Sequence, residues 1–188
     1  MGPDNQEVYQ RFRSVVGAVL LAFNPLSMKN LSSLLHDFNT PSDISTALNF
    51  LHSLLLVPED AEDSIRIFHK SFPDFLTDPK RCQDTQFFVD PSVHHMELLL
   101  SCLSLMEERL KRNICNLEDH GVLDDVKDLP AQRKEHIGGA LEYACRFWTK
   151  HLVRSSSHGP DAKKVQKAID KFFTTHLLFW VVSGPLSP

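Results

Sequence analysis

The chain has few glycines, and none of them stands in a phosphate-binding pattern. Its 188 residues include seven glycines, and no pair matches Gly-x-x-x-x-Gly-Lys-Ser/Thr, the loop whose backbone amides hold nucleotide phosphates. The chain alone is therefore predicted not to be an ATPase.

The sequence also lacks a strong net charge, a long apolar run and paired cysteines. Its 20 basic and 24 acidic residues give a formal charge of −4, so no general attraction to nucleic acid or to an anionic membrane is expected. The longest apolar runs, 15–23 and 177–182, are shorter than the roughly 20 residues that a bilayer requires. Four cysteines stand singly, and no secretory leader precedes them. We expect a cytoplasmic protein with reduced thiols and no membrane partner.

No cluster of residues indicates catalysis or metal binding. His94 and His95 precede Cys102, but zinc needs three or four converging ligands, and adjacent helical residues point about 100° apart. We interpret the two histidines as a helix N-terminal pair beside a core cysteine. Cys145 is predicted to be a buried thiol, and His176 an interior histidine. We expect no enzyme activity, no metal and no cofactor.

The first part of the chain predicts three helices and a hairpin. Ser27 can cap the second helix, and Thr40, followed by Pro41 and Asp43, can form a capping box for the third. Two short alternating runs then flank an acidic tip. These segments are helices over 6–23, 27–36 and from 41 onward, strands over 54–57 and 64–69, and the tip 58–63. This order is typical of a winged-helix domain with a small two-stranded β-wing, which we assign to residues 1–80.

The second part, residues 84–188, is predicted to be an α-helical bundle. Asp90 and Pro91 begin a long helix that ends near Asn113. Another apolar stripe covers 137–153, and Asp161 is expected to cap a last helix that reaches Trp180. In that helix Val165, Ile169, Phe172, Phe173 and His176 are expected to face inward. The fold class is therefore mainly α.

Winged helices often bind DNA, so a nucleic-acid-binding protein is the alternative function. That role needs Arg, Lys, Asn or Gln on the third helix and basic residues near the phosphates. No Lys or Arg occurs between Lys29 and Arg66, while the same segment holds six carboxylates. Nucleic acid is therefore not the partner that we expect.

His69 lies where strand periodicity changes to helix periodicity. Ile65, Ile67 and His69 share one side of the alternating run. Ser71 and Asp74 then fit a capping box for a short helix. A histidine at such a joint can be held rigidly and can donate a hydrogen bond to a phosphate oxygen. It can equally cap or pack the junction, and the residues alone leave both interpretations open.

Several short motifs resemble one family in the same order along the chain. They are Asn-Pro-Leu-Ser at 24–27, Phe-His-Lys-Ser-Phe-Pro-Asp-Phe-Leu at 68–76, Leu-Glu-Tyr-Ala-Cys-Arg-Phe-Trp-Thr-Lys-His-Leu at 141–152 and Leu-Leu-Phe-Trp at 177–180. Together they look like the segment that follows the NTPase core in fungal NACHT-domain proteins. These are STAND NTPases similar to NOD-like receptors, which act in nonself recognition and programmed cell death.

The resemblance implies a role for His69. In such proteins a histidine in a Met-His-Asp-type motif at the end of the wing contacts bound ADP, and His69 holds the matching position. Lys70 stands where the aspartate would be, and the NTPase core is lacking. The resemblance thus implies a fragment that acts as a non-catalytic regulatory module. Its expected partner is a protein, either the NTPase core or an effector domain of the same family.

Overall fold

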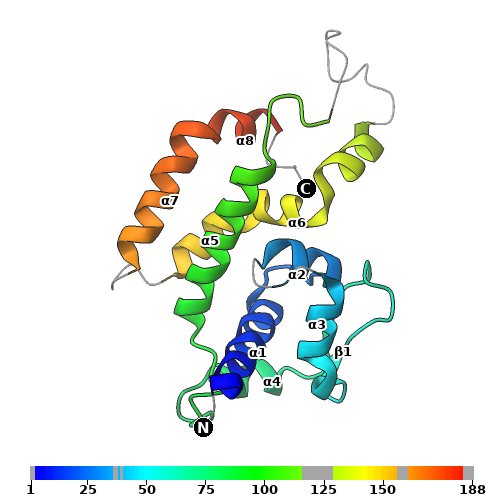
Figure 1. Ribbon diagram of the computed structural model, residues 1–188, viewed down its shortest axis with the longest axis vertical. Coiled ribbons are helices and arrows are strands. Elements are labelled where there is room, and N and C mark those ends of the chain that lie inside the picture. The colour runs from blue at the N-terminus through cyan, green and yellow to red at the C-terminus, as the bar shows by residue number, and fades with distance from the viewer. Residues whose placement is uncertain (1–2, 36–37, 39, 116–128, 156–160, 184–188) are drawn as a thin grey trace.

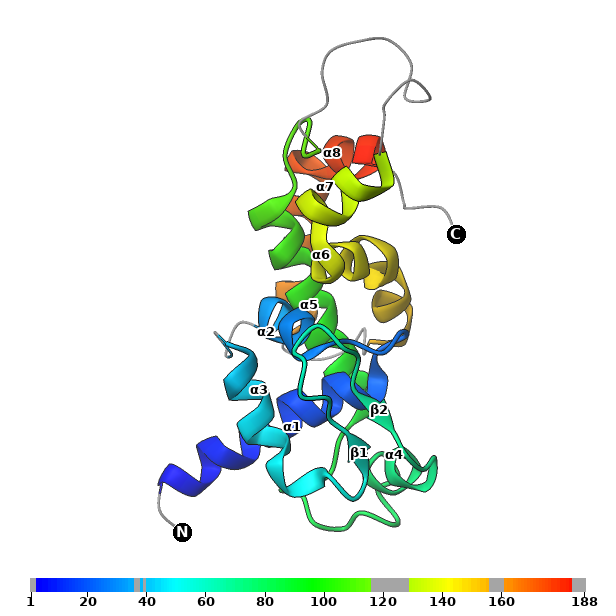
Figure 2. The ribbon, with the colours of Figure 1, turned by 90° about the vertical axis from the view of Figure 1, so that its right-hand side faces the viewer.

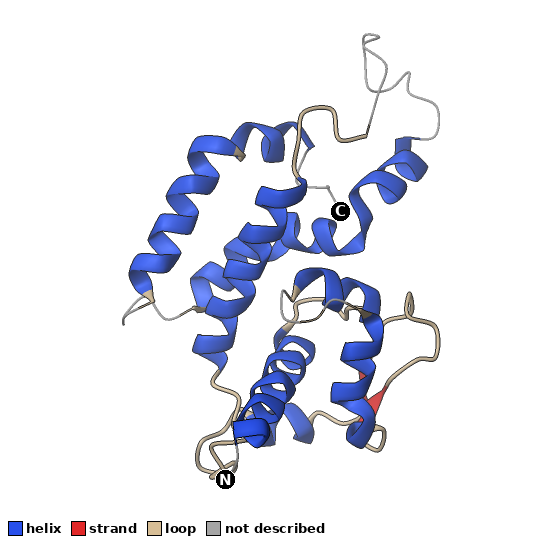
Figure 3. Ribbon diagram, in the orientation of Figure 1, coloured by secondary structure: helices blue, strands red, loops and turns tan. Residues whose placement is uncertain are grey.

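The computed structural model describes residues 3–35, 38, 40–115, 129–155 and 161–183. Within these ranges the protein is mainly helical, with one small two-stranded sheet (Figure 3). Figures 1 and 2 show α1–α4 and the hairpin at one end of the molecule and α7 and α8 at the other. Helix α5 runs between the two ends. No helix in the described ranges is both long and apolar enough to cross a bilayer.

The second and third helices begin where their caps predict, whereas the first begins at Pro3, earlier than the predicted residue 6. The three helices are α1 (Pro3–Leu21), α2 (Met28–Leu34) and α3 (Pro41–Leu48), and the 3₁₀ turn η1 (Asn49–Leu51) follows α3. The Ser27 hydroxyl accepts the Asn30 backbone N–H at the start of α2. Thr40 and Asp43 form the predicted capping box, with Pro41 in the first turn of α3. Local capping therefore fixes the N-terminal boundaries of α2 and α3.

The predicted hairpin forms, although its strands are shorter than the alternating runs. Strand β1 (Leu55–Leu56) pairs antiparallel with β2 (Arg66–Ile67), and Leu55 lies opposite Ile67. Leu55 is buried and Leu56 is exposed, as alternation requires. The acidic tip docks on α2 through a Lys29–Glu62 ion pair and a bond from the Lys29 N–H to the Ala61 carbonyl. The short helix α4 (Ser71–Leu76) follows.

Four helices make the rest of the described chain. They are α5 (Pro91–Arg109), α6 (Leu129–Arg154), α7 (Ala162–Thr175) and α8 (Leu177–Ser183). Asp90 caps α5 as predicted, accepting the N–H groups of Ser92 and Val93. That helix ends at Arg109, earlier than the predicted Asn113. Within α6, Gly138 has φ 70° and ψ 157°, a left-handed conformation that bends the helix.

The predicted last helix is two helices, which corrects the sequence-based boundary. The chain turns at His176, where φ is −124°, and α8 leaves at a new angle (Figure 1). This turn lets the Trp180 indole N–H donate to the Cys145 carbonyl at 3.0 Å. The predicted inward face is right for Val165 and Phe172, but Phe173 is 48% exposed. Asp161 takes the N-cap position without a side-chain cap bond.

The buried apolar side chains of both predicted parts form one continuous cluster. It extends from Val15 and Val16 of α1 through Leu99 of α5 to Leu141 of α6, all fully buried. Helix α5 contacts α1, α2, α6 and α7, so it carries the core from one end of the molecule to the other. The rigidity of any site on α5 or α6 therefore depends on both parts.

Candidate functional site

His69 is exposed, and its ring is held by the first residue of α4. The Ser71 backbone N–H donates to His69 Nδ1 at 3.1 Å, and the Ser71 hydroxyl lies 2.7 Å from the same nitrogen. Because a backbone N–H can only donate, Nδ1 is the acceptor and the proton of the neutral ring is on Nε2. No described group hydrogen-bonds Nε2 of this exposed residue. The ring therefore presents one N–H donor outward.

The same contacts show that the predicted Ser71–Asp74 capping box is wrong. Lys70 is already helical, with φ −59° and ψ −27°, and occupies the cap position without a side-chain bond. The Ser71 hydroxyl is directed to His69 rather than to the start of the helix. Both interpretations of His69 stay predictions, because the ring bonds the junction through Nδ1 and Nε2 has no partner among the described residues.

His94 and His95 point to different neighbours. His94 lies between two main-chain carbonyls, with Nδ1 3.0 Å from Asp90 O and Nε2 3.1 Å from Arg13 O. His95 instead contacts His151 of α6. No group of three potential metal ligands converges among the described residues. The two histidines join α5 to α1 and to α6 respectively.

A buried polar chain links α5 and α6 with the segment that follows α1. His95 Nδ1 and His151 Nδ1 are 2.9 Å apart, and His151 Nε2 is 2.8 Å from the Tyr143 hydroxyl. The Phe23 N–H donates to the Tyr143 oxygen at 3.3 Å. Both bonds can form between neutral rings, because the Tyr143 hydroxyl can donate to His151 Nε2 while His151 Nδ1–H donates to His95 Nδ1.

The surroundings of this chain oppose a positive charge on either ring. Burial lowers the pKa of His151 to about 3, with further lowering by His95 and Arg154. Burial and the charges of Arg154 and His94 also lower the pKa of His95. The Arg154 guanidinium lies over the Phe23 ring, 4.6 Å from its centroid. The histidine pair is thus a neutral core element beside a fixed cation.

Sequence reasoning placed the interior histidine at the wrong position. His176 is only half-buried and bonds the Thr175 hydroxyl, because the chain turns there. His151 is the fully buried histidine. It lies three residues after Trp148 and seven after Ala144, so helical spacing from that stripe could have found it.

The cysteines show no sign of a reactive thiol. Cys82, Cys102 and Cys145 are buried and free, and Cys115 is half-buried. Burial raises the pKa of Cys145 to about 12 and also raises the pKa of Cys102. At neutral pH the thiolate population at these two positions is negligible, as predicted for a buried Cys145.

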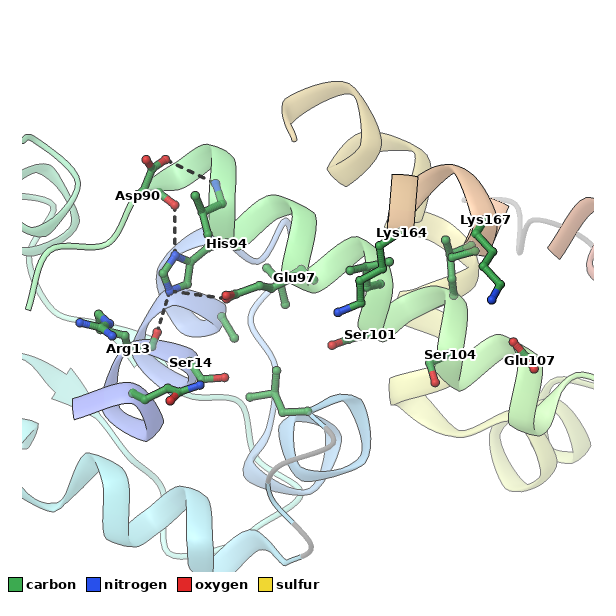
Figure 4. Close-up of a pocket in the computed structure, with 18 of the residues that line it drawn as sticks. Arg13, Ser14, Asp90, His94, Glu97, Ser101, Ser104, Glu107, Lys164 and Lys167 are labelled. Carbon is green, nitrogen blue, oxygen red and sulfur yellow. Dashed lines mark hydrogen bonds and ion pairs between the residues drawn. The ribbon is translucent and has the colours of Figure 1, made fainter. Parts of the chain in front are cut away.

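A groove of about 820 Å³ runs along α5, between α1 and α7 (Figure 4). Arg13 and His94 line one end, and Lys164 and Lys167 of α7 line the other. Ser101 and Ser104 line the groove from α5. No sequence motif indicates this groove, because α1, α5 and α7 come together only in the folded chain.

Comparison of the chain with family models, with curated proteins and with solved structures gave no match.

Proposed function

We propose that the protein is a non-catalytic regulatory module of a NACHT-type signalling NTPase, of the kind found in fungal nonself recognition and programmed cell death. In this proposal α1–α4 with the hairpin act as a winged-helix domain, and His69 contacts the nucleotide phosphate of an NTPase core. The observation that carries it is the exposed Nε2–H of His69, which Ser71 orients. The proposal rests further on the resemblance of the motifs at 24–27, 68–76, 141–152 and 177–180.

The backbone on both sides of His69 is anchored, which suits a group that must report on a ligand. The Phe68 N–H donates to the Leu54 carbonyl at 3.0 Å and continues the hairpin ladder. The Phe72 N–H donates to the His69 carbonyl at 3.1 Å and begins α4. A contact at Nε2 would therefore act directly on the angle between the hairpin and α4, a means of coupling nucleotide state to domain closure.

The test is binding of the protein to a purified NACHT NTPase core loaded with ADP or with ATP. We expect tighter binding to the ADP form, and a loss of roughly tenfold in that affinity for His69→Ala, since a hydrogen bond to a charged group is removed. His52→Ala is the matched control, because His52 is also exposed but lies outside the joint. If His69→Ala binds the ADP form as tightly as His52→Ala does, His69 is not the phosphate contact.

The competing winged-helix role, DNA binding, predicts a different result. Helix α3 exposes Ser42 and Thr46 and carries no Lys or Arg. A DNA reader would bind duplex at low salt, with an affinity that falls steeply as salt is added. We expect no mobility shift of any duplex at about 50 mM salt. A salt-sensitive shift would favour the nucleic-acid function instead.

A further inference from the structure

At one end of the groove beside α5, two lysines lack a carboxylate partner among the described residues. Lys164 and Lys167 line it from α7, and neither forms an ion pair with a carboxylate of the described residues. Both lysines are exposed on the face of α7 that looks toward α5 (Figure 4). Such ammonium groups are available to an anion.

Two of the three acidic residues that line the groove, Asp90 and Glu107, are engaged. Glu107 pairs with Lys171, whereas the exposed Glu97 lies 3.8 Å from His94 Nε2, which is an ion pair only when that ring is protonated. The Asp90 carboxylate accepts the backbone N–H groups of Ser92 and Val93 at the start of α5. Arg13, at the other end of the groove, donates to the Thr85 main-chain carbonyl at 3.0 Å, a neutral acceptor that does not cancel its positive charge. The cations that remain without a carboxylate partner therefore favour an anionic ligand.

Two hydroxyls of α5 face the same end of the groove. Ser101 and Ser104 are one turn apart and line the groove opposite the lysines. Within the described chain neither hydroxyl hydrogen-bonds another group, although helical serines commonly bond the preceding turn. Ammonium groups from α7 and hydroxyl groups from α5 thus offer donors from two sides, which suits the several oxygens of a tetrahedral phosphate.

We propose that this groove binds a small molecule with a phosphate group and an apolar body, the phosphate lying between Ser101 and Ser104 of α5 and Lys164 and Lys167 of α7. The apolar body lies along the floor made by Val93, Leu100 and Leu103. A volume of about 820 Å³ is much larger than one phosphate and within the range of small-molecule pockets. This site is independent of His69 and of the proposed NTPase partner.

Phenyl phosphate, inorganic phosphate and benzoate are suitable probes, titrated into the full chain by calorimetry. We expect phenyl phosphate to bind roughly tenfold more tightly than inorganic phosphate, because its ring covers the apolar floor. Benzoate should bind more weakly than phenyl phosphate, because it has fewer oxygens and one charge. No binding of phenyl phosphate, or benzoate binding as tightly, would overturn the proposal.

Variants then locate the phosphate. The double variant Lys164→Gln/Lys167→Gln should weaken phenyl phosphate binding roughly tenfold or more, and Ser101→Ala about threefold. Lys163→Gln is the matched control, since Lys163 is an exposed lysine of the same helix that does not line the groove. All these positions are at least partly exposed, so the fold should persist. A loss in Lys163→Gln equal to that in the double variant would show attraction by net charge and overturn the site.

Discussion

Gly17→Ala is expected to lower the melting temperature by roughly 6–12 °C, which corresponds to about 3 kcal/mol for a chain of this size. Helix α1 passes α5 at Gly17, and the His94 ring lies against its backbone. A Cβ at position 17 would be 2.1 Å from His94 Cδ2 and 2.7 Å from Nε2. The ring is held between the Asp90 and Arg13 carbonyls, so it cannot turn aside without losing its polar contacts with them. The stability lost through this clash exceeds the roughly 1 kcal/mol by which alanine is more favourable than glycine in a helix interior.

Gly139→Ala is the matched control, because it makes the same exchange within α6. A Cβ there would meet only the end of the Asn30 side chain, with Nδ2 at 2.5 Å. That amide can rotate away, so we expect a change in melting temperature of less than about 3 °C. The comparison separates a helix-propensity effect from a clash at the α1–α5 crossing.

A double variant tests the assigned cause. In Gly17→Ala/His94→Ala the methyl group no longer meets a ring, so the two losses should be strongly non-additive. The double variant should be more stable than the sum of the single losses by about 1–2 kcal/mol in chemical unfolding. Additive losses would mean that Gly17 is needed for a reason other than the His94 ring.

The parts of the fold that were predicted correctly are those with a local cause. Ser27, Thr40 and Asp90 each accept a backbone N–H within three residues, so their sequence patterns fix the starts of α2, α3 and α5. The hairpin follows in the same way from alternation around an acidic tip. Whether these elements amount to a winged helix depends on packing, which local patterns do not determine.

The features that the sequence did not predict depend on contacts between distant segments. The break at His176 is stabilised by the hydrogen bond from the Trp180 indole N–H to the Cys145 carbonyl, 35 residues away in sequence. The α5 groove needs three helices to meet, and the His95–His151 contact joins residues 56 apart. His69 lies at the predicted junction between the hairpin and a short helix. Ser71, which was predicted to cap that helix, instead bonds the His69 ring.

Acid is expected to destabilise the protein through the His95–His151 pair, well before its carboxylates titrate. In the folded chain both rings have lowered pKa values, about 3 for His151, because they are buried near Arg154. In the unfolded chain each ring takes a proton below about pH 6.5. The unfolded state therefore binds more protons as the pH falls from about 6.5 toward 3, and stability declines across this window.

The expected loss is roughly 2 kcal/mol between pH 7 and pH 5 from His151 alone, since each ring contributes up to about 1.4 kcal/mol per pH unit. Urea unfolding at several pH values measures it directly. The pKa of Asp90 is lowered by its bonds to Ser92 and Val93, which outweigh the opposing effect of burial. The contribution of Asp90 to folding stability is thus present above about pH 4 and lost only below it. The change in stability between pH 7 and pH 5 therefore reports on the histidines.

His151→Gln separates the titration from the packing of the network. Glutamine cannot take a proton, so the variant should be less stable at pH 7, with Tyr143 and His95 imperfectly paired, yet should lose much less stability between pH 7 and pH 5. His52→Ala, which removes an exposed ring, should keep the full acid dependence. The acid dependence is assigned to the neutral His151 ring, which resists protonation in the core. An acid dependence in His151→Gln as steep as in the native protein would contradict it.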